Sequence, residues 1–258
     1  MLWIMIACKS VKPAPQDIDG LSHYFWQKYD ADDSSVLEEG LRNAFSALNV
    51  NELSDPLRGS ITPLSREELD LVGKTEEDPA SLSGVYFANI IHCPINSVEK
   101  GLYALNQDQR HEGTYEEYNR QYTSSLEQYE RRQSDRLSWH TEYKINDLGQ
   151  KLTVNINGEI RHLGELTVEA PPTGQAFIAR AVLEDENAYF EGSDTRGMFQ
   201  DYQLEVYFQR SPTETVHFFT IWREMVYTSA IDFSSETMQG FVLDGMLEWD
   251  ADAEAECH

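Results

Sequence analysis

Residues 202–227 are YQLEVYFQRSPTETVHFFTIWREMVY, and this stretch decides the fold class that the sequence predicts. Two segments rich in aromatic and β-branched residues, 202–210 and 215–227, flank a polar turn at 211–213. Such segments favour strands, and a short turn between them predicts an antiparallel pair. In 215–227 both alternating sets of side chains are largely apolar, so we expect both faces of this strand to be buried.

Further strands are expected upstream, at residues 85–92, 137–145, 151–156, 159–163 and 175–183. Asn157-Gly158 predicts a tight hairpin, because both positions of that turn need positive φ. Residues 113–136 fit a helical stripe, but Tyr118, Arg120 and Tyr122 also alternate as a strand would, and we favour strands.

Helical spacing marks both ends of the chain. Two helices are predicted within 17–49, the second starting with a capping box of Ser35 and Glu38, and a single turn at 65–69 has the same spacing. A short helix should follow Cys93-Pro94. After Ser234-Ser235, apolar residues recur at helical spacing at positions 238, 241, 242, 246 and 249. A helix therefore follows the strands.

This element order resembles the START-like, helix-grip superfamily, through residues 85–105, 137–227 and 235–249. The resemblance implies an α+β fold in which an antiparallel, strongly curved β-sheet packs on a C-terminal amphipathic helix, preceded by N-terminal helices. It also implies an apolar cavity for lipids, sterols or other hydrophobic small molecules. A lipocalin-like barrel is the alternative, and fold alone does not choose between binding, catalysis and interaction.

The chain divides into three predicted parts. Residues 1–16 are expected to be a truncated lipoprotein signal and tether, 17–83 an N-terminal helical and irregular extension, and 84–258 the helix-grip-like domain.

The N-terminus is an apolar run, Met1 to Ala7, that stops at Cys8. Ala7-Cys8 resembles the lipobox of bacterial lipoproteins, in which a small residue precedes the cysteine that carries the lipid. Met5 stands where Leu is usual, and the run is shorter than a typical signal and has no basic region, which a start upstream of Met1 would explain. The resemblance implies lipidation of Cys8 and a membrane-anchored protein of the bacterial cell envelope, at the outer membrane facing the periplasm or the surface.

If Cys8 carries a lipid, Cys93 and Cys257 remain as an even pair in an oxidising compartment. An even number of cysteines in such a compartment suggests a disulfide between them, and two unrelated free thiols are the alternative. Neither cysteine has a partner at metal-ligand spacing, so no metal and no cofactor is expected.

The chain is strongly acidic, with 45 Asp and Glu against 20 Lys and Arg and a formal net charge of −25. Such a surface repels phosphate backbones, so nucleic acid is a poor candidate partner. We interpret the charge as serving solubility, with cation binding as the less favoured use.

Arg223 is the first candidate for ligand binding, because its strand face also carries apolar side chains, Phe219, Ile221 and Met225. A cation framed in this way could hold a ligand carboxylate in a hydrophobic pocket. The alternative is that Arg223 pairs with a carboxylate of a neighbouring strand, such as Glu205. Trp139, Tyr143 and His217 are further candidates for the pocket wall, with ordinary core packing as the alternative for the aromatic residues.

No catalytic motif is present. An enzyme would need His140, His162 or His217 to meet a carboxylate or Arg223 in a cleft. We therefore expect a lipid-anchored envelope protein that binds a hydrophobic small molecule or lipid. A non-enzymatic protein–protein interaction module with a filled core is the alternative, and an enzyme is the least favoured.

Overall fold

The computed structural model describes residues 13–147, 149–166, 172–184, 187–228, 231–232 and 236–257. Its helices are α1 (Ile18–Lys28), α2 (Ser35–Ala47), α3 (Arg66–Asp70), the 3-10 turn η1 (Pro79–Ser81), α4 (Ile95–Tyr103), α5 (Gln107–Arg110), α6 (Leu126–Glu130) and α7 (Glu236–Ala255). Its strands are β1 (Leu57–Ile61), β2 (Ser83–Ile91), β3 (Glu117–Tyr122), β4 (Arg136–Asp147), β5 (Gln150–Glu165), β6 (Gln175–Leu183), β7 (Ala188–Tyr189), β8 (Gly197–Ser211), β9 (Glu214–Thr228) and β10 (Ile231–Asp232).

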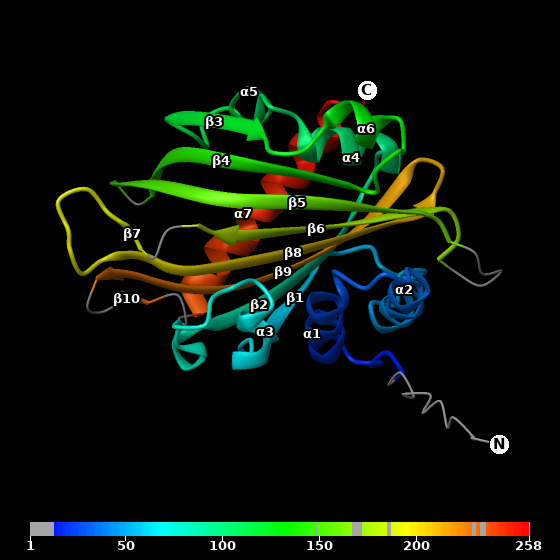
Figure 1. Cartoon of the computed structure of the whole chain (residues 1–258), viewed down its shortest axis with the longest axis horizontal. Helices are drawn as coiled ribbons and strands as arrows, with labels where there is room; N and C mark the ends of the chain where they lie inside the picture. The colour runs from blue at the N-terminus through cyan, green and yellow to red at the C-terminus, as the bar shows by residue number, and fades with distance from the viewer. Residues whose placement is uncertain are drawn as a thin grey trace, which may run out of the picture.

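The strands form one antiparallel sheet in the order β1-β2-β9-β8-β6-β5-β4-β3, with β10 beside β9 and β7 beside β8. The sheet curves around α7, which crosses its far side in Figure 1. Among the described residues, the outer strands β1 and β3 do not pair with each other, so the sheet stays open. The predicted α+β architecture is confirmed, and the lipocalin-like barrel does not form.

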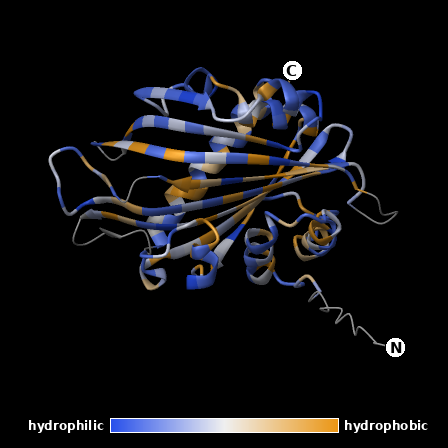
Figure 2. Cartoon of the chain, viewed as in Figure 1, coloured by the Kyte–Doolittle hydropathy of each residue, from blue (hydrophilic) through white to orange (hydrophobic). Residues whose placement is uncertain are grey.

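Both faces of the central strand β9 are buried, as its sequence predicts. Phe218 and Trp222 pack with α1 and α2 on one face. Phe219 and Ile221 point to the other face, where they pack with Leu243 of α7. Apolar and polar residues accordingly mix along the strands in Figure 2. The sheet is thus the middle layer between the N-terminal helices and α7.

The predicted Asn157-Gly158 hairpin is wrong, because both residues lie inside the continuous strand β5. The hairpin between β4 and β5 falls about ten residues earlier, where Asp147 pairs with Gln150 and Gly149 has a φ of +78°. Gly158 pairs with Trp139 of β4, and the Trp139 ring occupies the space that a Cβ at position 158 would take. The glycine here permits close packing and does not form a turn.

Two local predictions need correction. Residues 113–136 contain the expected strand β3, but α6 follows it at Leu126–Glu130, where the side chain of Ser125 caps the helix. At α2, Ser34 is the N-cap and makes no side-chain hydrogen bond, so the Ser35 capping box does not form. The Asp33 carboxylate accepts the Ser35 N–H instead. The capping box at Ser65 and Glu68 is confirmed.

The lipidation candidate Cys8 lies outside the described residues. Within the part of the chain that the structure describes, no helix is both long enough and apolar enough to cross a bilayer.

Candidate ligand-binding cavity

A cavity of about 180 Å³ lies between the sheet and α7. Strands β3, β4, β5, β6, β8 and β9 form its floor, and Met246 and Trp249 of α7 cover it. Its wall is mainly aromatic and aliphatic, and includes Tyr115, Trp139, Tyr143, Ile156, Ala181 and Phe219. Such a wall suits an apolar ligand.

Polar groups enter this wall from β3. Alternate residues of β3 are exposed, and the others, Tyr118, Arg120 and Tyr122, are partly buried. The Arg120 guanidinium lies over the Trp139 ring, 4.8 Å from its centre. Its Nε donates to Thr141 Oγ1 at 3.1 Å, and its Nη1 donates to the carbonyl of Leu102 at 2.7 Å. Arg120 is therefore held in one orientation at the cavity wall.

A buried ionic network adjoins the cavity. His217 of β9 is fully buried, and its Nδ1 lies 2.8 Å from Oδ1 of Asp250 on α7. The other oxygen of Asp250 accepts from the Asn89 amide at 2.9 Å. His217 Nε2 lies 3.4 Å from Oε2 of Glu205, which also accepts the Tyr207 hydroxyl. Burial alone would lower the pKa of His217, but Asp250 and Glu205 raise it to about 9.

Three of the predicted ligand contacts, Trp139, Tyr143 and Phe219, line the cavity. Ile221 and Met225 lie in the apolar cluster under the N-terminal half of α7. The structure thus brings the two aromatic candidates of β4 together with Phe219 of β9, although these residues are 76 to 80 positions apart.

Arg223 lies elsewhere, against β8. Its Nε donates to Oδ2 of the fully buried Asp201 at 2.6 Å. Arg223 therefore pairs with a carboxylate of a neighbouring strand, as the alternative interpretation expected, but this carboxylate belongs to Asp201 and not to Glu205.

The other two histidine candidates also contact carboxylates, at sites separate from the cavity. His140 Nδ1 lies 2.8 Å from Glu184 at a partly exposed position. His162 Nδ1 lies 3.0 Å from Glu99, a buried carboxylate whose pKa burial would raise but hydrogen bonds lower to about 2. Among the described residues, no group of three or more His, Cys, Asp and Glu side chains is placed to hold a metal ion.

Sequence reasoning missed Tyr118 and Arg120 as site residues. Their signal was present, because an arginine alternated with tyrosines on one face of a possible strand. Their role depends on β3 lying at the sheet edge beside β4, where Arg120 pairs with Thr141 and Tyr118 pairs with Tyr143.

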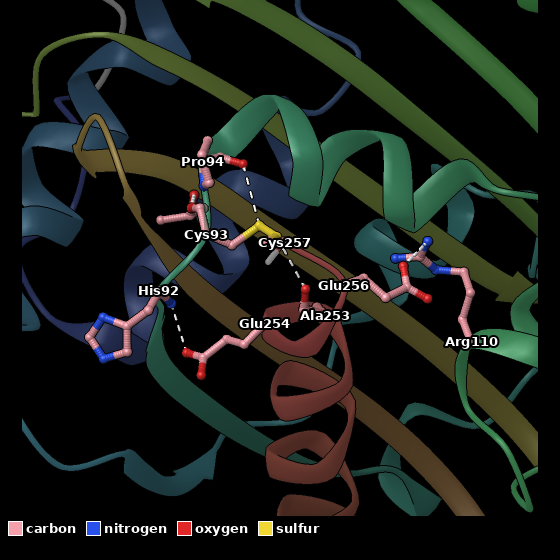
Figure 3. Close-up of a disulfide and its surroundings, with 9 residues drawn as sticks. His92, Cys93, Pro94, Arg110, Ala253, Glu254, Glu256 and Cys257 are labelled. Atoms are coloured by element: carbon pink, nitrogen blue, oxygen red, sulfur yellow. Dashed lines mark hydrogen bonds and ion pairs between the residues drawn. A yellow bond between two sulfur atoms is a disulfide. The ribbon is translucent and has the colours of Figure 1, made fainter.

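The C-terminal turns of α7 are fixed to the body of the protein (Figure 3). Cys257 forms a disulfide with Cys93, at a Cα–Cα distance of 5.7 Å that is normal for such a bond. Glu254 accepts the backbone N–H of His92 at 2.7 Å, and Glu256 pairs with Arg110. The helix that covers the cavity is therefore anchored at one end.

This arrangement, a curved antiparallel sheet around a C-terminal helix with a cavity between them, is a helix grip.

Solved structures with a similar arrangement include the following three. For a START superfamily protein from Mycobacterium smegmatis the TM-score is 0.43 at 7% identity, over 67% of this chain and 96% of that chain. For the lipid transfer and protein localization domain of human StarD13 the TM-score is 0.46 at 7% identity, over 80% of this chain and 87% of that chain. For a STAR-related lipid transfer protein from Xanthomonas axonopodis the TM-score is 0.41 at 6% identity, over 69% of this chain and 86% of that chain. No protein-family model matches the chain, and no curated protein matches its sequence.

Proposed function

We propose that this protein binds a small hydrophobic molecule in the cavity between its sheet and α7, and that a lipid on Cys8 tethers it to the bacterial cell envelope. The observation that carries the binding proposal is the cavity itself, about 180 Å³ with a mainly aromatic and aliphatic wall. An interaction module with a filled core would not need this space.

The volume favours a small molecule over a two-chain lipid. Pockets for drug-sized ligands measure about 300–1,000 Å³, whereas a cavity of about 150 Å³ accepts benzene. A ligand of one ring with short substituents fits this space, and a larger one would extend out of the cavity or require α7 to move.

The envelope location is supported by two features. The apolar run that ends at Ala7-Cys8 resembles a lipobox. The Cys93–Cys257 disulfide is the kind of bond that persists in oxidising compartments such as the periplasm.

Filling the cavity tests the binding proposal. Ala181 of β6 lines it, so Ala181→Leu should fill part of the space and weaken ligand binding at least about tenfold, because the larger side chain overlaps the volume that the ligand needs. Ala251→Leu, at an exposed position of α7, adds the same atoms outside the cavity and is the matched control.

The measurement is native mass spectrometry of protein purified from its own host, followed by titration of the recovered ligand into both variants. Co-purification of a small hydrophobic molecule with wild type and the Ala251→Leu variant, but not with the Ala181→Leu variant, is expected. Equal ligand content in both variants would contradict the proposal.

The anchor is tested separately by palmitate labelling of wild type and Cys8→Ala, with and without globomycin. We expect label on wild type only, and accumulation of the uncleaved precursor with globomycin. Label that persists in Cys8→Ala would contradict lipidation at Cys8.

A further inference from the structure

One cation in the cavity wall, Arg120, has only neutral hydrogen-bond partners, and Glu205 of the same wall attracts it without forming an ion pair with it. Arg120 donates to Thr141 Oγ1 and, through Nη1, to the carbonyls of Leu102 and Ala104 at 2.7 and 3.3 Å. Within the described ranges, no carboxylate oxygen lies within 4 Å of its guanidinium. The side chains of Trp139 and Tyr118 face it with their rings.

A charge in such surroundings is costly. Buried ions are normally paired, because transfer out of water is unfavourable unless an opposite charge offsets it. Burial lowers the pKa of Arg120, yet arginine stays protonated in proteins. The two carbonyls end α4, and a helix C-terminus supplies about half a negative charge, so they offset the cation only in part.

The cavity wall also has hydrogen-bond donors without acceptors. Among the described residues, Nη2 of Arg120 has no protein acceptor, since the hydrogen bonds of this side chain use Nε and Nη1. The hydroxyl oxygen of Tyr118 is buried beside Thr141 and Arg120, and in the described part of the chain no group meets it at hydrogen-bond geometry. Both residues line the same cavity. A ligand oxygen is the missing acceptor that this wall would accommodate.

The acidic side chain in the wall, Glu205, is already engaged by His217 and Tyr207. With His217 protonated, its single positive charge leaves the two carboxylates, Glu205 and Asp250, with a net charge of −1. The positive charge of Arg120 brings the wall and its network to zero, so a ligand with one negative charge leaves a smaller charge imbalance than a ligand with two. This balance disfavours a phosphate dianion.

From these contacts we infer that the ligand is a small monocarboxylic acid with an apolar body, and that Arg120 receives its carboxylate while the apolar body lies against Tyr143, Phe219 and Met246. The inference rests on the proposed function and specifies its ligand class. Nε and Nη1 already have acceptors, so Nη2 is the nitrogen left for this role, and its N–H groups can donate charge-assisted hydrogen bonds to a carboxylate oxygen.

Two probes of the same shape test it, 3-phenylpropionate and its neutral amide, 3-phenylpropanamide. Each is titrated calorimetrically, at about pH 7, into wild type, Arg120→Met and Arg120→Lys. We expect the acid to bind wild type at least about tenfold more tightly than the amide, because a charge-assisted hydrogen bond in a desolvated site is stronger than a neutral one. In Arg120→Met the preference should vanish, and Arg120→Lys should retain part of it.

The outcomes separate the two proposals. If acid and amide bind wild type equally and both are weakened by Ala181→Leu, the cavity binds hydrophobic molecules and the carboxylate inference is overturned. If neither binds wild type, both the inference and binding of this size class in the cavity fail.

The inference can be tested even if the Arg120→Met variant does not fold. The ratio of acid to amide affinity in wild type needs no variant, and a ratio below about three overturns the inference whatever the variants do. Tyr118→Phe removes only the hydroxyl, and we expect it to weaken the acid more than the amide.

Discussion

At the scale of single residues, His217 makes the stability of the protein depend on pH above neutrality. It is buried between α7 and the sheet, with Asp250 and Glu205 on its two ring nitrogens. These acids raise its pKa to about 9, against an ordinary value of 6.5, although burial opposes them. The folded protein thus binds this proton more tightly than the unfolded chain does. The resulting stability is fully present below about pH 6.5 and is lost as the pH rises through 9.

We therefore predict that the free energy of unfolding of wild type falls between about pH 6.5 and 9, by on the order of 3 kcal/mol from His217. His217→Gln should be destabilised at neutral pH, because Asp250 and Glu205 lose their cation. Its stability should change less across the same pH window. Chemical denaturation at a series of pH values measures both.

The exposed His92 provides the control, since His92→Gln removes an imidazole without touching the network. The pH dependence of its unfolding free energy should follow that of wild type.

Unfolding at acid pH involves other groups. Burial opposes ionisation of Glu68 and Glu99, but hydrogen bonds lower their pKa values to about 2, so the stability that these two carboxylates contribute is lost as the pH falls below about 4.5. A wild-type profile that is flat from pH 6.5 to 9 would contradict a protonated His217.

At the scale of elements, α7 is attached unevenly. In its last turns, Asp250, Asp252, Glu254 and Glu256 each contact a partner on the body of the protein, and the disulfide follows. Its first half makes apolar contacts through Leu243 and neighbouring residues. Its ion pair between Asp244 and Arg58 is exposed at both ends and contributes little.

We predict that α7 opens from its N-terminal half, so amides of 239–247 should exchange with deuterium at least about tenfold faster than those of 249–256. Gly245 sits mid-helix with no atom near the position of a Cβ. Gly245→Ala should therefore stabilise the helix by about 0.5–1 kcal/mol and slow exchange in the first half. Exchange in α1 serves as the internal control, and uniform protection along α7 would refute uneven opening.

The sequence predicted elements well where one pattern dominated. The strands β6, β8 and β9 and the helix α7 follow from alternation or helical spacing that few alternatives fit. It failed at Gly158, where a glycine needed for contact with the Trp139 ring has the same local signature as a turn glycine. Local sequence cannot separate the two, because the partner lies on another strand.

At the scale of the whole molecule, the cavity could be predicted only in part. Its aromatic wall was accessible because Trp139 and Tyr143 alternate on one strand. The cation was not, because the place of Arg120 depends on the pairing of β3 with β4 and on α4 ending at the same point. Such a site is set by sheet register and helix packing together, which one sequence does not specify.

The Cys93–Cys257 disulfide acts on the whole chain, because it closes a loop over 164 positions. In the chain-entropy model, a loop of this size restricts the unfolded state by about 5 kcal/mol, an upper figure. In the folded state, Glu254 and Glu256 hold the same end of α7 in place through His92 and Arg110. The bond should therefore stabilise the fold much more than it shapes the cavity.

We predict that the double variant Cys93→Ser, Cys257→Ser loses on the order of 3–5 kcal/mol of unfolding free energy, whereas its affinity for a cavity ligand changes less than about threefold. Denaturant titration and calorimetry measure the two quantities. Wild type treated with a thiol reductant, and shown by intact mass to be heavier by two hydrogen atoms, should behave like the variant. If ligand affinity falls in step with stability, the disulfide and not the acidic anchors holds α7 over the cavity; if neither changes, the bond does not form in the native protein.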